Sequence, residues 1–113
     1  MEHEMRLDPE PFRMIKSGQK TIELRLYDEK RRKIAVGDTI AFTETKTGER
    51  MRVIVTDLSV FPTFSELYRA LPLQKCGYTE AELETASPDD MLAYYSLERQ
   101  RQYGVVGIGI AKL

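Results

Sequence analysis

One eight-residue stretch, Gly18 to Arg25, constrains the fold more than any other part of the chain. Gly18 suits the exit of a helix, and apolar side chains then alternate with polar ones, at Ile22, Leu24 and Leu26. Such alternation is typical of a strand with one apolar face. Glu23 and Arg25 are two residues apart, so they project from the same face, and Lys20 lies just before the strand. The stretch therefore predicts three ionic groups at one strand entrance.

Strand and helix patterns alternate along the rest of the chain. Met5–Leu7 reads as the end of a first strand, and Asp8 followed by Pro9 predicts the start of a helix. Residues 39–43 and 51–60 are rich in β-forming side chains and predict a hairpin, because a turn sequence joins them.

The second half of the chain predicts helices followed by one strand. Capping-box pairs begin two helices, at Thr63 with Glu66 and at Thr79 with Glu82. Ser87-Pro88 predicts a third helix, which carries Met91 and Tyr95 inward. Residues 103–113 predict a final strand, in which Gly107 and Gly109 leave room for another element to approach closely. This order predicts an α+β fold with a mixed, largely antiparallel sheet and inserted helices.

The composition predicts one ordinary globular domain over residues 1–113. Its apolar fraction of 42% and charged fraction of 31% are typical of such domains, and the length is too short for two cores. No apolar run is long enough to span a membrane, and the first residues do not resemble a signal peptide. The single cysteine, Cys76, has no partner for an internal disulfide. We therefore expect a cytoplasmic protein without membrane association.

The charges are unevenly distributed although the net charge is only −1. Residues 13–33 carry eight basic and three acidic side chains, whereas residues 79–98 carry six acidic and no basic ones. A protein of this kind can present a positive face to an anion while staying nearly neutral. The same distribution is equally consistent with two solvated faces that attract each other across the fold.

Several kinds of site are not expected. The chain has no glycine-rich phosphate loop, and its single histidine, His3, makes a zinc site or a histidine-dependent nucleophile improbable on spacing. Cys76 is most simply a small core or loop residue. We therefore predict a site that requires neither a metal nor an organic cofactor.

The ionic residues of the Gly18–Arg25 stretch have useful chemistry. Lys20 can bind an anion, or act as a base where burial lowers its pKa. Glu23 can accept a proton or a hydrogen bond from an amino group, and Arg25 can orient Glu23 or bind a phosphate. The alternative is an exposed strand face on which Glu23 and Arg25 form an ordinary ion pair.

The spacing Gly18-x-Lys20-x-x-Glu23-x-Arg25 resembles the signature of the ASCH domain family. Three flanking features extend the resemblance over essentially the whole chain: a helix with Phe12 and Ile15, the Val36-Gly37-Asp38 turn, and the closing Tyr103-Gly-Val-Val-Gly-Ile strand. The resemblance implies a small PUA-like β-barrel of five or six strands flanked by helices, with the first and last strands near one another. It also implies a cleft beside the motif and binding of RNA or a nucleotide.

Some members of the family that this chain resembles are enzymes, including an N4-acetylcytidine deacylase group and a ribonuclease. The deacylases use a lysine that Lys20 matches, but Glu23 stands at the position of their threonine. Their downstream glutamate aligns near Cys76, where this chain has no acid. We therefore do not expect this chain to deacylate N4-acetylcytidine.

The leading prediction is an RNA- or nucleotide-binding protein with a basic cleft around the motif. In that interpretation Lys20 and Arg25 hold phosphate or ribose, and Glu23 reads a base edge. Tyr27 stacks on a base or is simply a surface tyrosine. The alternative is a metal-independent hydrolase of RNA or a modified nucleoside (ribonuclease or acylcytidine amidohydrolase type), with Lys20 and Glu23 as an acid–base pair. The predicted ligand-binding residues are Lys20, Glu23, Arg25, Tyr27, Arg31, Arg32 and Tyr95.

Overall fold

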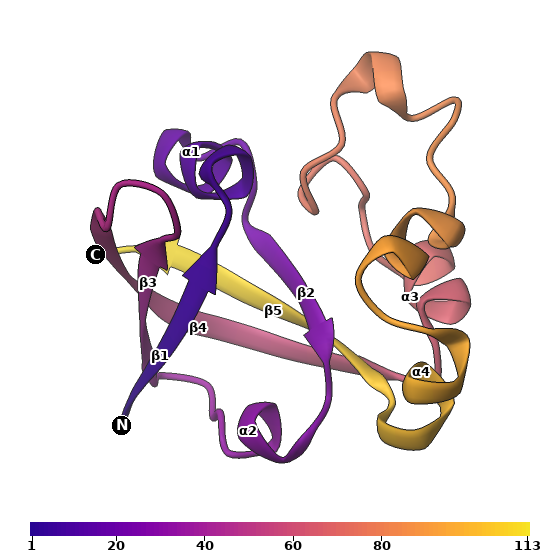
Figure 1. The fold of residues 1–113 in the computed structure, drawn as a ribbon, viewed down its shortest axis with the longest axis horizontal. Helices are drawn as coiled ribbons and strands as arrows, with labels where there is room; N and C mark the ends of the chain where they lie inside the picture. The colour runs from indigo at the N-terminus through magenta and orange to yellow at the C-terminus, as the bar shows by residue number, and fades with distance from the viewer.

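The computed structural model describes residues 1–113, and a single five-stranded sheet forms its centre (Figure 1). The strands are β1 (Glu2–Leu7), β2 (Ile22–Leu26), β3 (Thr39–Glu44), β4 (Arg50–Phe61) and β5 (Val105–Lys112). Their order across the sheet is β1-β3-β4-β5-β2. Only β1 and β3 pair in parallel, and the other three pairs are antiparallel. The predicted mixed, largely antiparallel α+β fold is therefore confirmed.

The sheet curls into a half-barrel that stays open between its two edge strands, β1 and β2. β1 and β5 are not neighbours, because β3 and β4 lie between them in the sheet order. The first and last strands therefore do not pair by hydrogen bonds, although side chains of both belong to the same buried apolar cluster. One side chain bridges the opening, since Arg25 of β2 donates from Nη2 to the backbone oxygen of Arg6 in β1, at 2.8 Å.

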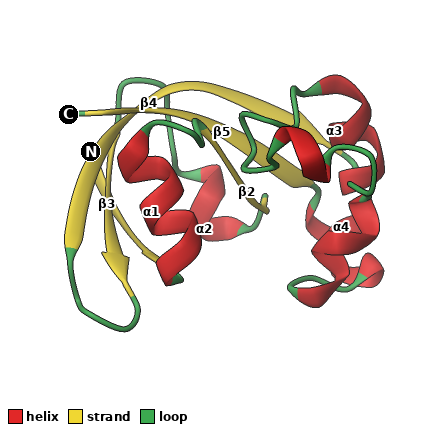
Figure 2. Ribbon diagram, turned by 90° about the horizontal axis from the view of Figure 1, so that it is seen from above, coloured by secondary structure: helices red, strands yellow, loops and turns green.

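Helices occupy the concave side of the sheet and one of its ends. They are α1 (Pro9–Ser17), α2 (Glu29–Arg32), α3 (Phe64–Ala70) and α4 (Leu97–Tyr103), with two 3₁₀ turns, η1 (Glu80–Glu82) and η2 (Pro88–Ala93). Figure 2 shows α1 and α2 within the curve of the sheet, while α3 and α4 gather where β4 ends and β5 begins. None of these helices combines the length and apolar character that crossing a membrane requires.

The predicted helix starts are largely confirmed. Capping boxes join Thr63 to Glu66, Thr79 to Glu82 and Ser87 to Asp90. The last two begin 3₁₀ turns rather than α-helices. Asp8 has the extended backbone of a cap, but its carboxylate does not cap the helix and instead accepts a hydrogen bond from Thr45.

Two helices were not predicted. The run of basic residues after Asp28 forms α2, and the Asp28 side chain caps it by accepting from the Arg31 backbone N–H at 3.1 Å. α4 ends at Tyr103, so the last strand begins at Val105 rather than at Tyr103. Gln100 of α4 is buried and its side-chain oxygen accepts from the Phe64 N–H at 3.1 Å, a tertiary contact that periodicity does not reveal.

The apolar side chains form two buried clusters on this framework. The larger lies between α1 and the sheet and contains Met5, Leu7, Phe12, Ile15, Ile34, Ile40, Phe42, Val53, Val55, Val106, Ile108 and Ile110. The smaller joins β2 and β5 to α3 and contains Leu24, Leu26, Phe64, Leu67, Cys76 and Val105. Met91 and Tyr95 pack against the smaller cluster, as predicted.

The two glycines of β5 permit the close approach that the sequence predicted. A Cβ atom at Gly107 would lie 2.6 Å from Leu71 Cδ1, at the end of α3. A Cβ atom at Gly109 would lie 1.9 Å from Asp57 Oδ1, beside the register shift between Val55 and Asp57. A side chain at either position would therefore force these neighbouring side chains to move.

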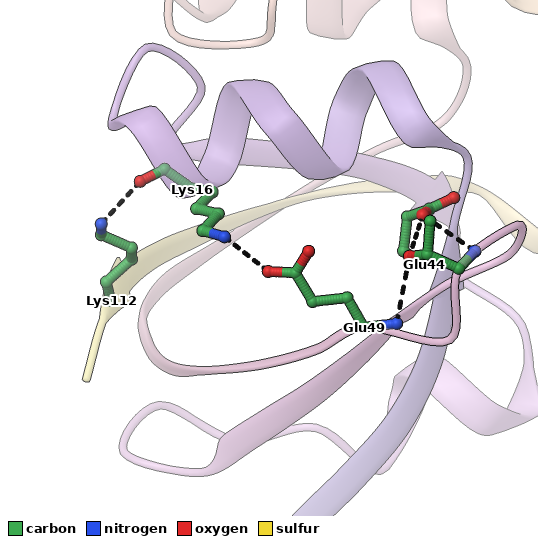
Figure 3. A network of polar contacts seen from close by, with 5 residues as sticks. Lys16, Glu44, Glu49 and Lys112 are labelled. Carbon is green, nitrogen blue, oxygen red and sulfur yellow. Dashed lines mark hydrogen bonds and ion pairs between the residues drawn. The ribbon is translucent and has the colours of Figure 1, made fainter.

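A polar network fastens α1 to the β3–β4 turn and to the end of β5 (Figure 3). Lys16 Nζ contacts Glu49 Oε2 at 2.5 Å, and Lys112 Nζ donates to the Lys16 carbonyl at 2.6 Å. Glu44 is buried and accepts from the backbone N–H groups of Lys46 and Thr47. The Glu44 contacts order the β3–β4 turn, and the Lys16 contacts fix α1, the helix that precedes Lys20, against that turn and β5.

Candidate functional site

Lys20, Glu23 and Arg25 meet beside the open edge of the half-barrel. Gly18 ends α1 with φ 87°, a left-handed conformation that suits glycine, and the Lys20 N–H then donates to the Met14 carbonyl at 3.1 Å. Lys20 Nζ lies 2.8 Å from Glu23 Oε1. Arg25 contacts the other carboxylate oxygen, with Nε at 2.8 Å and Nη2 at 2.7 Å. Both oxygens of Glu23 are therefore held by cations.

This cluster is largely withdrawn from water. The side chain of Glu23 is 5% exposed, and those of Lys20 and Arg25 are 12% and 13% exposed. Burial alone raises the pKa of Glu23, but the charges and hydrogen bonds of Lys20 and Arg25 outweigh it and lower that pKa below its ordinary value. Glu23 is thus an ionised carboxylate that fixes the two cations.

The cluster forms part of the lining of a cavity of about 510 Å³. α1 and the start of β2 border one side, and the segment from Tyr68 to Tyr95 borders the other. Apart from Lys20, Glu23 and Arg25, the charged residues that line it are Arg6, Asp8, Glu82 and Asp90. The acidic segment of the sequence thus folds across the cavity from the basic motif, and the lining carries both signs of charge.

Four tyrosines contribute to the lining, namely Tyr68, Tyr78, Tyr94 and Tyr95. Tyr95 stacks on Phe64 with 6.1 Å between ring centroids, which fixes its ring in the smaller apolar cluster. Tyr94, by contrast, is 69% exposed. The cavity therefore combines a fixed aromatic ring with a solvent-facing one, a combination suited to flat ligands.

A short chain of hydrogen bonds crosses this tyrosine wall. Tyr68 Oη lies 2.7 Å from Tyr78 Oη, which in turn donates to Asp90 Oδ2 at 2.7 Å. Burial, together with these two neighbours, raises the pKa of Tyr78. Because Tyr78 gives its only proton to Asp90, Tyr68 must donate to Tyr78. The remaining capacity of the Tyr68 oxygen is then to accept a hydrogen bond.

Cys76 lies in the same lining beside the Lys20 side chain. Burial raises the pKa of its thiol to about 11, with a smaller opposing effect of Lys20. At neutral pH the thiol is therefore protonated and a weak nucleophile. Cys76 also belongs to the smaller apolar cluster, in agreement with the interpretation of Cys76 as a core residue.

The predicted ligand-binding residues fall into two places. Lys20, Glu23, Arg25 and Tyr95 line the cavity, whereas Tyr27, Arg31 and Arg32 do not. Arg31 forms an ion pair with Asp28 at 3.0 Å. Arg32 lies over the Tyr27 ring, 4.4 Å from its centroid, and donates to the Tyr103 carbonyl at 2.9 Å. These three residues therefore lie outside the lining of the motif cavity, and their part in ligand binding stays a prediction.

Sequence reasoning missed the opposite wall of the cavity. Asp90 belongs to the segment that begins at Ser87, and its carboxylate also accepts from the Ser87 N–H, which is a local capping role. Tyr68 lies on α3 and packs in part against the smaller cluster, as a side chain on the apolar face of a helix does. Neither pattern indicates that the two residues are joined through Tyr78.

Residues 5–113 match the model of the ASCH domain. The chain belongs to the ASCH domain family. The crystal structure of the hypothetical protein PH0355 is 36% identical, with a TM-score of 0.83 and complete coverage of both chains. The solution structure of PF0455 from Pyrococcus furiosus is also 36% identical, with a TM-score of 0.72, over 100% of this chain and 98% of that one.

A more distant ASCH structure shows the shared fold. It is the S128A mutant of ZmASCH from Zymomonas mobilis, 15% identical with a TM-score of 0.66, matched over 98% of this chain and 68% of that one. The half-barrel is thus the PUA-like fold of ASCH proteins. No match is found among curated proteins.

Proposed function

We propose that the cavity of this ASCH protein binds one nucleoside or nucleotide unit, either free or within an RNA chain. Lys20 and Arg25 would donate to phosphate or ribose oxygens, and the tyrosine wall would contact the base. The volume of about 510 Å³ lies within the range of small-molecule sites and suits one such unit.

The observation that carries this proposal is the buried Lys20–Glu23–Arg25 cluster at the cavity. Burying three ionic groups costs solvation free energy, and apolar residues of similar size would serve stability equally well or better. The cluster has one more positive than negative charge, so it retains attraction for an anionic or strongly polar ligand. Its position in the lining favours a role in ligand binding over a purely structural one.

The arrangement of Glu23 supports binding more than hydrolysis. Each carboxylate oxygen is already engaged by a cation, and the lowered pKa makes Glu23 a poor proton acceptor. Cys76, where the deacylase resemblance would require an acid, is a buried thiol. We therefore assign Glu23 the role of positioning Lys20 and Arg25.

Isothermal titration calorimetry with the four ribonucleoside monophosphates tests the proposal. We expect saturable 1:1 binding of at least one of them, weakened about tenfold or more in Lys20→Ala because a charge-assisted hydrogen bond is removed. Lys46→Ala is the matched control, since Lys46 is exposed in the β3–β4 turn outside the cavity. Absence of binding by the wild-type protein, or equal weakening in both variants, would contradict the proposal.

Turnover distinguishes the binding interpretation from the hydrolase alternative. Incubation with N4-acetylcytidine and with short RNAs should leave both intact, as judged by chromatography. Product formation that disappears in Lys20→Ala would replace the binding proposal with the hydrolase.

A further inference from the structure

A second hollow lies where residues of α2, the end of β4 and the α4–β5 junction meet. Figure 1 shows α2 and α4 in its lower part. Its volume is about 430 Å³ and it is more open than the motif cavity. We call it the α2–α4 groove. The nine residues that line it are Tyr27, Arg32, Val60, Phe61, Pro62, Arg101, Gln102, Tyr103 and Gly104. It shares no lining residue with the motif cavity.

The α2–α4 groove differs from the motif cavity in charge. Its lining includes two arginines and no carboxylate, whereas four carboxylates line the motif cavity. The Arg101 side chain is exposed and forms no hydrogen bond or ion pair with the rest of the chain. Lys30 and Lys33, which are close to Arg32 in sequence, are also exposed. This lining fits an anionic partner.

The groove also presents aromatic and apolar surface. The Arg32 guanidinium stacks on Tyr27 and is held there by its hydrogen bond to the Tyr103 carbonyl. Val60 is 50% exposed at the groove, although it lies in β4 next to the partly buried Phe61. Such an ordered guanidinium plane, with an aromatic ring beneath it, is a platform on which an unpaired base can stack.

We propose that the α2–α4 groove binds single-stranded RNA, with its arginines on phosphates and a base stacked on Arg32 or an adjoining ring. An acidic peptide would use the cations but would leave the stacking platform and Val60 without a matching partner. The end of β2 joins the two hollows, because Arg25 lines the motif cavity and Tyr27 lines the groove. Arg25 and Tyr27 are two residues apart, so at most about 7 Å of backbone separates them. A single RNA strand could therefore occupy both hollows. The choice of RNA rests on the proposed function of the motif cavity.

Fluorescence anisotropy with a labelled mixed-sequence RNA decamer tests this surface. We expect the Arg32→Ala/Arg101→Ala variant to lower affinity and to flatten the plot of log K against log salt by about 1.4, or about 0.7 for each phosphate that an arginine no longer neutralises. The charge-matched control is Arg13→Ala/Lys46→Ala, since Arg13 and Lys46 are both exposed and lie outside the groove. Its slope should equal that of the wild type.

A second measurement separates this proposal from the function of the motif cavity. Calorimetry with ribonucleoside monophosphates should give unchanged binding in Arg32→Ala/Arg101→Ala and weakened binding in Lys20→Ala. Failure of the wild-type protein to bind monophosphates would contradict the proposed function of the motif cavity. An RNA salt slope that is unchanged in Arg32→Ala/Arg101→Ala would contradict RNA binding at the α2–α4 groove.

Two variants guard against misfolding and against nonspecific charge effects. Arg101→Ala alone leaves every intramolecular hydrogen bond intact, and it should still flatten the slope by about 0.7. Arg32→Lys keeps the charge but not the planar stack, and it should lower RNA affinity several-fold with the salt slope retained. No RNA binding by the wild type, equal slopes in all variants, or tighter binding of a poly-glutamate peptide than of RNA would overturn the proposal.

Discussion

At the scale of single residues, Glu23 is a carboxylate held between two cations and almost entirely removed from water. Its neighbours lower its pKa, so the folded protein holds this carboxylate ionised more strongly than the unfolded chain does. A group with a lowered folded-state pKa contributes stability above its unfolded pKa, near 4.5. That contribution disappears as the pH falls through the folded-state pKa.

Comparison of the wild type with Glu23→Gln should make this linkage visible. At pH 7 the variant should be the less stable, because Lys20 and Arg25 are left without their counter-charge. The difference in free energy of unfolding should begin to shrink as the pH falls below about 4.5, and it should disappear once the pH passes through the lowered folded-state pKa of Glu23. Urea unfolding at each pH measures it, and a difference independent of pH would contradict the role given to Glu23.

The predictable part of the site was the part that lies within one stretch of sequence. Alternation placed Glu23 and Arg25 on one face of β2, and the glycine before Lys20 marked the end of α1. Tyr68 and Asp90 could not be placed in the same way, because each had a sufficient local role in a helix face or a cap. Their proximity depends on tertiary packing, which no local period encodes.

At the scale of elements, the segment between α3 and α4 forms the far wall of the cavity with little regular structure. η1 and η2 are short 3₁₀ turns, and several of their stabilising contacts are made by side chains. The Tyr68–Tyr78–Asp90 chain joins α3 to η2 through a residue that lies just before η1. The hydroxyl of Tyr78 thus couples three elements that the sequence pattern treats separately.

Tyr78→Phe should loosen this wall while leaving the sheet intact. Removal of the hydroxyl eliminates two hydrogen bonds, each with a net value of about 1 kcal/mol. We expect faster amide hydrogen exchange in residues 78–95, measured by mass spectrometry, with unchanged exchange in β3, β4 and β5. Tyr94→Phe is the control, because the Tyr94 hydroxyl makes no hydrogen bond within the chain. Equal exchange in Tyr78→Phe and wild type would show that the hydrogen-bond chain does not hold the wall.

At the scale of the whole molecule, the half-barrel brings the basic and acidic segments to opposite sides of one cavity. Residues of both charged segments therefore line the same cavity. Lys20 and Arg25 line the cavity, and we expect the acidic segment, which contributes Glu82 and Asp90, to weaken the attraction that an approaching anion meets. By contrast, the α2–α4 groove has no carboxylate in its lining. Long-range electrostatic attraction should consequently draw an anionic ligand towards the groove. In the cavity, the affinity should depend mainly on short-range contacts with the ligand.

Removal of acidic charge from the cavity's far wall should change the rate of ligand association more than the rate of dissociation. Glu80 and Glu84 are exposed and do not line the cavity, so Glu80→Gln/Glu84→Gln alters the field without touching the site. Stopped-flow measurements with a fluorescent ribonucleotide at about 20 mM salt should show association a few-fold faster than in the wild type. The gain should vanish near 1 M salt, where the screening length falls to about 3 Å. Because neither glutamate contacts the cavity, a change confined to dissociation would contradict a long-range origin, and equal rates at low salt would show that the acidic segment does not oppose the approach of anions.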